Sequence, residues 1–151
     1  MIDIVIPVYN EAENIGPCLW AIQQKVTCEY TVWIIYDRDE DTTLPPAKAT
    51  AAKLGIKINY YKNKYGHGAL NAIKTGLEDS NAKYVIVTMA DLCDPPEVIN
   101  NMLSLAEEKH LDIVCASRYM KGGRQIGGPA IKSLLSKVAG LSLYYLTGLP
   151  T

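Results

Sequence analysis

The sequence contains no phenylalanine and none of the patterns that mark metal knuckles, disulfide frameworks, membrane spans or nucleic-acid binding. Its four cysteines, Cys18, Cys28, Cys93 and Cys115, form no CxxC pair, which argues against a zinc knuckle or a disulfide framework and favours a reduced compartment. The formal net charge of -1 gives no bulk attraction for nucleic acid. No run of about 18 uncharged apolar residues is present, so no membrane-spanning helix is predicted.

The chain has the composition of one soluble domain. It has 151 residues, 48% of them hydrophobic, and its 10 tyrosines must supply some of the aromatic packing. The first predicted strand starts at Ile2, which leaves no room for a signal peptide. We therefore expect a single cytoplasmic domain over 1–151.

Apolar runs alternate along the chain with stretches of helical periodicity. This alternation predicts a mostly parallel α/β sheet with helices on both faces, and such sheets bind ligands at the carboxyl ends of their strands. Strands are predicted over 2–9, 30–36, 56–62, 82–89 and 111–117, and helices over 14–26, 45–55, 67–79, 95–110 and 127–149.

Helix ends and helix faces can also be predicted. Asn14 is the predicted N-cap of the first helix, and Gly55 is placed to end the second. Spacing puts one apolar side on the first helix and one on the third. These sides comprise Ile15, Leu19, Ile22 and Val26 on the first helix, and Leu70, Ile73 and Leu77 on the third.

Polar residues follow every predicted strand. The stretch "YDRDEDTT" after the second strand carries four acids in five positions. It is either a solvated turn that caps the next helix or a set of acceptors for the N–H and O–H groups of a nucleobase or ribose. After the third strand, "NKYGHGALNA" places Gly66 and Gly68 before a helix, a weak anion-binding motif in which His67 is a surface or ligand-edge residue.

The stretch "TMADLCDPPEVI" after the fourth strand carries the sharpest signal. Asp91 at a strand end suits Mg²⁺ or Mn²⁺, which take carboxylate oxygens together with substrate phosphates. Asp94 is either a second ligand or the N-cap of the following helix.

A basic stretch, "SRYMKGGR", follows the fifth predicted strand. It holds Arg118, Lys121 and Arg124, with Lys132 further on. It is either a solvated loop or a phosphate-binding loop, and the guanidinium of Arg118 is the best candidate for a phosphate contact.

Together these stretches resemble a known family. "VIPVYNEAENI", "NKYGHGALNAIKTGLEDSNAKYVIVTMADLCDPPEVI" and "DIVCASRYMKGG" are similar to the family 2 glycosyltransferases of GT-A fold, and within them to the polyprenyl-phosphate sugar transferases of the dolichyl-phosphate mannose synthase type. The resemblance runs in order from Ile2 to about Gly123. It implies a Rossmann-like catalytic domain with a nucleotide-binding half over 1–91 and a partial, truncated-looking acceptor half over 92–151.

The resemblance also implies site residues. It makes Asp91 and Arg118 catalytic, with Asp91 and Asp94 at the metal. The implied nucleotide-binding residues are Pro7, Tyr9, Glu11, Asp37, Asp39, Gly66, Gly68 and Ala90, and the implied acceptor-phosphate residues are Arg118, Arg124, Lys132 and Ser136.

Three departures from the family pattern stand out. Met89 replaces the first acid of the DxD motif, so a two-carboxylate clamp cannot form. "YDRDEDTT" replaces the usual acid-acid-Gly-Ser run, which leaves guanine and uracil open as the base. The chain also ends at "LTGLPT", where related enzymes continue.

These features predict an enzyme that moves a sugar from a GDP- or UDP-sugar, with inversion and divalent-metal assistance, to a polyprenyl phosphate. A phosphate acceptor is already anionic and needs no general base, and Asp112 is the last acid in the chain. The alternative is a non-catalytic nucleotide-sugar-binding module. The final helix, with Lys132 and Lys137 beside an apolar side of Leu134, Val138, Leu141 and Tyr145, either rests peripherally on the cytoplasmic membrane face or packs on protein.

Overall fold

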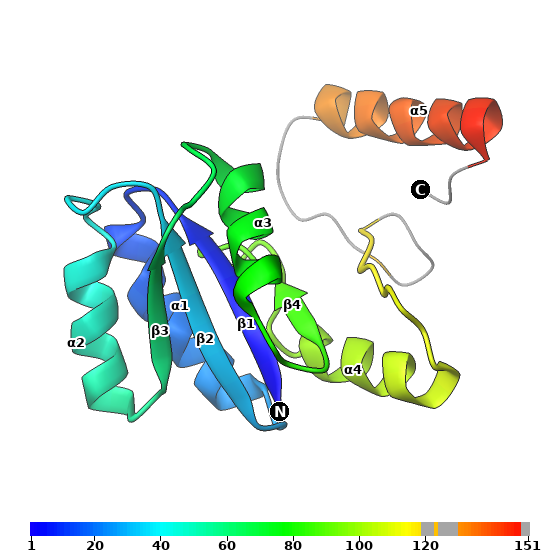
Figure 1. The fold of residues 1–151 in the computed structure, drawn as a ribbon. Helices are drawn as coiled ribbons and strands as arrows, with labels where there is room; N and C mark the ends of the chain where they lie inside the picture. Colours follow the sequence, from blue (N-terminus) through cyan, green and yellow to red (C-terminus); the bar gives the residue numbers. More distant parts are fainter. Residues whose placement is uncertain (119–122, 124–129, 149–151) are drawn as a thin grey trace. The chain divides into compact units, whose positions relative to one another are not determined.

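The computed structural model describes residues 1–118, 123 and 130–148. The chain divides into two compact units, Met1–Val114 and Cys115–Thr151. The first unit holds, in chain order, β1 (Ile2–Val8), α1 (Ala12–Lys25), β2 (Tyr30–Tyr36), α2 (Leu44–Leu54), β3 (Ile58–Lys62), α3 (Ala69–Asp79), β4 (Val85–Val87) and α4 (Val98–Lys109), and the second holds α5 (Ala130–Thr147) (Figure 1).

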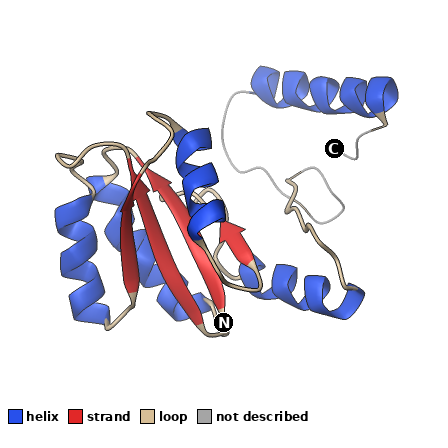
Figure 2. Ribbon diagram, in the orientation of Figure 1, coloured by secondary structure: helices blue, strands red, loops and turns tan. Residues whose placement is uncertain are grey.

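The first unit is built on a parallel sheet with strand order β3-β2-β1-β4 (Figure 2). β1 and β2 pair along their whole length, from Ile2 opposite Tyr30 to Val8 opposite Tyr36. β4 pairs with β1 over three positions only, from Asp3 opposite Val85 to Val5 opposite Val87. The predicted parallel α/β sheet is confirmed.

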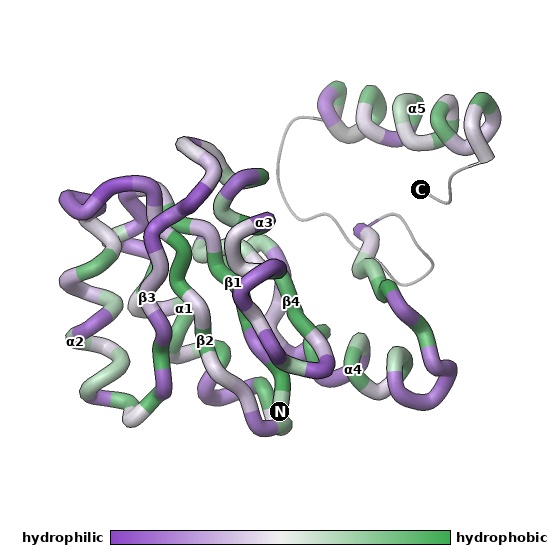
Figure 3. Tube along the Cα trace, viewed as in Figure 1, coloured by the Kyte–Doolittle hydropathy of each residue, from purple (hydrophilic) through white to green (hydrophobic). Residues whose placement is uncertain are grey.

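Both faces of this sheet are covered by helices. Alternate residues of a strand point to opposite faces. Ile4 and Ile6 pack with Leu19 of α1, and Val5 packs with Ala72 of α3. Figure 1 shows α3 in front of the sheet and α1 behind it, and Figure 3 shows hydrophobic colouring along β1, β2 and β4.

α1 starts earlier than predicted. It begins at Ala12 with Glu11 as its N-cap residue, so the prediction of Asn14 as N-cap is wrong. The Asn14 side chain instead lies within the first turn and donates a hydrogen bond to Glu11 Oε2 at 2.6 Å. The predicted apolar side is buried, as expected for Ile15, Leu19, Ile22 and Val26.

α2 ends at Gly55, whose φ of 67° is left-handed, as predicted.

α3 packs on the sheet with a side of small residues, and not with the leucine side that the sequence predicted. Leu70 is 79% exposed and Leu77 is also exposed, whereas Ala72, Thr75 and Gly76 are buried. A Cβ at Gly76 would stand 2.6 Å from Val5 Cγ1. α3 therefore lies so close to β1 that only small residues fit between them.

The fifth predicted strand is absent from the described residues. Residues 111–117 form no strand, and β4 is shorter than the predicted 82–89. A strand is stabilised by its ladder hydrogen bonds, so an apolar run without a paired neighbour does not form one.

The second unit contains the helix predicted near the C-terminus. α5 spans Ala130–Thr147 and exposes apolar side chains such as Leu134, Val138 and Tyr145. Within the described residues, no helix combines the length and the apolar character needed to cross a membrane.

Candidate functional site

The loops that follow β1 and β2 are tied together by hydrogen bonds. The Asn10 N–H donates to both carboxylate oxygens of Asp41, each at 3.2 Å, and the Glu11 N–H donates to Thr43 Oγ1 at 2.8 Å. Asp41 and Thr43 are buried, and the Thr43 N–H donates to Asp41 Oδ1 at 2.9 Å. Asp41 therefore has a structural role, because its hydrogen bonds hold the two loops together.

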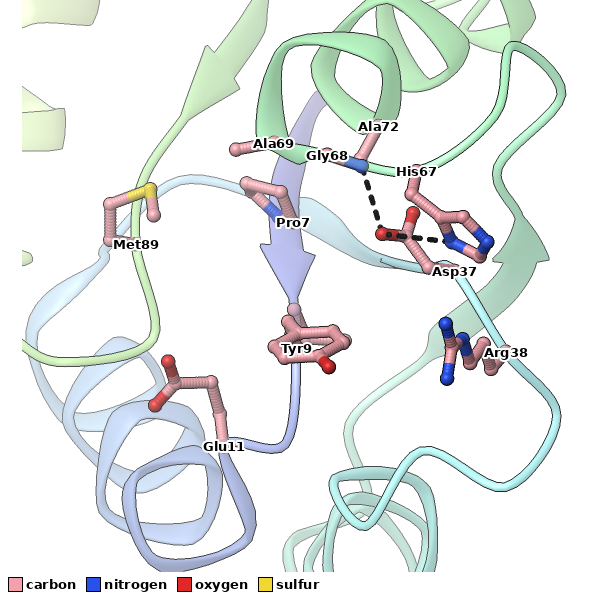
Figure 4. A pocket seen from close by; sticks show the side chains of 11 residues that line it. Pro7, Tyr9, Glu11, Asp37, Arg38, His67, Gly68, Ala69, Ala72 and Met89 are labelled. Atoms are coloured by element: carbon pink, nitrogen blue, oxygen red, sulfur yellow. Dashed lines mark hydrogen bonds and ion pairs between the residues drawn. The ribbon is translucent and has the colours of Figure 1, made fainter.

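Asp37 ties the loop after β2 to the glycine turn after β3. Its Oδ1 accepts from Asn63 Nδ2 at 2.8 Å. Its Oδ2 accepts from the Gly68 N–H at 2.9 Å (Figure 4). The turn needs glycine because Gly66 and Gly68 have φ of 85° and 114°. His67 Nδ1 lies 3.6 Å from Asp37 Oδ2. The turn is thus held at the carboxyl end of β2.

The Asp37 carboxylate is stabilised in its charged form. Its side chain is only 8% exposed. Burial alone would raise its pKa, but the hydrogen bonds from Asn63 and Gly68, together with the nearby His67, outweigh burial and lower the pKa below 3.8. Asp37 is therefore an anion at neutral pH.

The loops that follow β1, β2 and β3 border an open cavity of about 480 Å³ at the carboxyl ends of the strands. Of the predicted nucleotide-binding residues, five lie on its wall: Pro7, Tyr9, Glu11, Asp37 and Gly68 (Figure 4). Three lie off it: Asp39, Gly66 and Ala90. Ala90 is buried, and the exposed Asp39 is paired with Lys62 Nζ at 2.5 Å.

Other residues of the wall were not predicted as binding residues. Arg38, Ala69, Ala72 and Met89 line the cavity, as does Val8, and so does His67, which the sequence suggested as a surface or ligand-edge residue. The sequence held a partial signal for Arg38 and His67, because both lie in loops at strand ends. It held none for Ala72, which reaches the wall because α3 packs so close to β1.

The turn that carries Asp91 lies off the cavity wall, although Met89 two residues earlier is on it. Asp91 is exposed, and its carboxylate accepts from the Cys93 N–H at 3.0 Å and from the Cys93 thiol at 3.1 Å. These two bonds lower the pKa of Asp91 below 3.8. Burial, with a further contribution from the negative charge of Asp91, raises the pKa of the Cys18 thiol to about 11.

The alternative prediction for Asp94, that it is the N-cap of α4, is wrong. The N-cap residue of α4 is Glu97, and Asp94 lies exposed ahead of it. Within the part of the chain that the structure describes, no group of three His, Cys, Asp or Glu side chains could hold a metal ion by itself.

The predicted phosphate-binding residues belong to the second unit. Arg118 is exposed, and Lys132 and Ser136 are exposed one turn apart on α5. Arg124 falls outside the described residues.

Curated relatives of the chain include several lipid-linked sugar transferases. The chain is 30% identical over 139 residues to a dolichol-phosphate mannosyltransferase of Pyrococcus furiosus, covering 91% of this chain and 39% of the relative. It is 27% identical to an undecaprenyl-phosphate 4-deoxy-4-formamido-L-arabinose transferase of Serratia proteamaculans, covering 94% and 45%. The chain therefore spans less than half the length of these relatives.

Solved structures share the fold. The mannosyltransferase PcManGT from Pyrobaculum calidifontis, in complex with GDP-Man and Mn2+, superposes with a TM-score of 0.61 at 20% identity, covering 70% of this chain and 32% of that one. The S. aureus protein TarS superposes with a TM-score of 0.64 at 20% identity, covering 85% and 23%. The predicted GT-A fold is confirmed.

The family profile described as glycosyl transferase family 2 matches residues 3–133, which is most of the chain and includes all three stretches that carried the resemblance. The chain belongs to glycosyl transferase family 2.

Proposed function

We propose that this chain forms the donor-binding part of a glycosyltransferase that moves a sugar from a nucleotide-sugar, with inversion, to a polyprenyl phosphate. The observation that carries the proposal is the cavity at the carboxyl ends of the strands, because it lies where α/β sheets bind nucleotides and its volume suits such a ligand. Relatives named for dolichol phosphate and undecaprenyl phosphate support the class of acceptor.

The nucleotide would occupy the cavity. Tyr9, which is 61% exposed, offers an aromatic face for a base, and Pro7 offers a second apolar surface. Glu11, Asp37 and Gly68 supply polar groups to the wall, beside Arg38 and His67. Asp39, Gly66 and Ala90 would contribute from beside the cavity.

Asp91 would hold a divalent cation such as Mg²⁺ or Mn²⁺ against the diphosphate. It is exposed, and its lowered pKa keeps it anionic. Such ions often take one or two carboxylates and complete their coordination with water and phosphate, which fits a site with Met89 in place of a second acid and with Asp94 nearby in the sequence. When bound, the ion would neutralise charge on the leaving diphosphate.

The acceptor would be positioned by the second unit. A polyprenyl phosphate is anionic at neutral pH, so it needs cations to orient it more than a base to activate it. Arg118, Arg124 and Lys132, with Ser136, are the proposed phosphate contacts. The exposed apolar residues of α5 beside Lys132 and Lys137 suit peripheral contact with a membrane surface.

Calorimetric titration tests the donor site. We expect a GDP or UDP titration to show binding that strengthens with Mn²⁺, and Asp91→Ala to remove the Mn²⁺ effect while Asp112→Ala, a matched exposed acid, retains it. Transfer of labelled sugar to polyprenyl phosphate then tests the reaction. Absence of binding to either nucleotide with wild-type protein would contradict the proposal.

The second candidate is a binding module without turnover. Met89 favours it, because a thioether on the cavity wall gives a hard cation no useful ligand. Nucleotide binding without any sugar transfer to the lipid phosphate would support this candidate over the enzyme.

A further inference from the structure

The acids of the loop after β2 are largely used within the fold. Asp37 accepts from Asn63 and Gly68, Asp39 is paired with Lys62, and Asp41 accepts from two backbone N–H groups. Glu40, the remaining acid, is not on the cavity wall. The predicted set of acceptors for a nucleobase is therefore mostly committed to holding the loops in place.

Arg38 is the residue of this loop that remains available. It is exposed, it lines the cavity, and its side chain makes no ion pair with any residue in the described part of the chain. Figure 4 shows its guanidinium turned into the cavity toward the ring of Tyr9. The wall thus presents a fork of hydrogen-bond donors beside an aromatic face.

A guanidinium fork donates two parallel hydrogen bonds and accepts none, so it matches two adjacent acceptor atoms. Guanine offers such a pair at O6 and N7. Cytosine offers one at O2 and N3. Uracil presents two carbonyl oxygens separated by an N–H donor, and adenine presents N7 next to an amino donor.

We infer that Arg38 selects the donor base, and that the cavity takes a nucleoside diphosphate whose base carries two adjacent acceptors, guanine or cytosine, in preference to uracil. The inference rests on the proposed function, since it concerns the same cavity. In the stretch "YDRDEDTT", the group that recognises the base is then the guanidinium of Arg38, and not one of the carboxylates.

The test measures binding of GDP, CDP and UDP, with Mn²⁺, to the full 151-residue chain. We expect GDP or CDP to bind about tenfold or more tightly than UDP, as expected for one bidentate contact to a base. Arg38→Lys keeps the charge and removes the fork, so it is expected to bring the three affinities within about threefold of one another. Lys53→Gln removes an exposed charge from α2 and is the control that should leave the ratios unchanged.

Two outcomes would overturn the inference. One is a wild-type preference for UDP, and the other is a GDP or CDP preference that survives Arg38→Lys. Both leave the nucleotide site itself intact, whereas binding of none of the three nucleotides would contradict the proposed function together with the inference. 7-deaza-GDP, which lacks the N7 acceptor, separates the two bases: if guanine is read, it should bind about as weakly as UDP.

Discussion

The centre of the sheet and its β4 side differ in the length of their strand pairing and in burial. β1 and β2 pair over seven positions each, and every residue of β1 is buried. β4 has three residues, with Val87 exposed, and the apolar run at 111–117 pairs with no strand among the described residues. Both regions have strand-like sequences, so apolar character alone does not decide which run becomes a strand.

The difference also separates two groups of the proposed site residues. At the centre, loops leaving β1, β2 and β3 are cross-linked by Asp37, Asp41 and Thr43, and they enclose the cavity. On the β4 side, Asp91 sits on an exposed turn whose carboxylate is bonded only to Cys93 among the contacts described. This arrangement offers a preformed cavity, which we propose as the nucleotide site, and a less constrained turn, which we propose as the cation site.

The largest expected effect contrasts the two regions directly. Ile34→Ala in β2 removes a fully buried side chain and should lower the free energy of unfolding by about 2–5 kcal/mol. Ile113→Ala, in the predicted but unformed strand, should cost less than about 0.5 kcal/mol because Ile113 is 79% exposed. Urea unfolding followed by the fluorescence of the buried Trp33 measures both. A comparable cost at Ile113 would show that 111–117 packs as a strand in solution.

A smaller effect is expected where α3 meets β1. Gly76→Ala would place a methyl group 2.6 Å from Val5 Cγ1 and should destabilise by about 1–3 kcal/mol despite the better helix propensity of alanine. Gly16→Ala in α1 is the matched control, since its nearest contact would be Thr50 Oγ1 at 3.4 Å, and it should be neutral or stabilising. Thermal unfolding of the two variants compares them. Equal stability of both would mean that α3 can move away from β1.

The smallest effect concerns the cavity loops. Asp37→Asn turns one acceptor into a donor facing Asn63 and Gly68, and we expect a loss of about 1–2 kcal/mol at neutral pH. The pKa of Asp37 is lower in the folded chain, so the unfolded chain takes up the proton first as pH falls. The stabilisation is therefore present above about pH 3.8 and lost below it.

Urea unfolding of wild type and Asp37→Asn at several pH values measures this dependence. The difference between the two proteins should shrink as the pH falls through the acid range. A difference that stays constant with pH would mean that the charge of Asp37 contributes nothing to holding the glycine turn.

The sequence alone determined the alternation of strands and helices, the parallel sheet and the edge at which polar loops gather. Strand periodicity, buried apolar runs and a glycine such as Gly55 at a helix end are local properties, so they can be read without knowing any long-range partner. The strand at 30–36 and the buried side of α1 were predicted for this reason.

Tertiary structure alone decided which side chains reach the cavity and which stay within the fold. The Asp37 carboxylate accepts hydrogen bonds from Asn63 and Gly68, which lie 26 and 31 positions further along the chain. This leaves Arg38 as the available group of its loop. Leu70 is exposed because the close approach of α3 to β1 selects small residues, and 111–117 lacks a strand because pairing needs a neighbour. Each outcome depends on contacts between distant segments, which local sequence patterns do not encode.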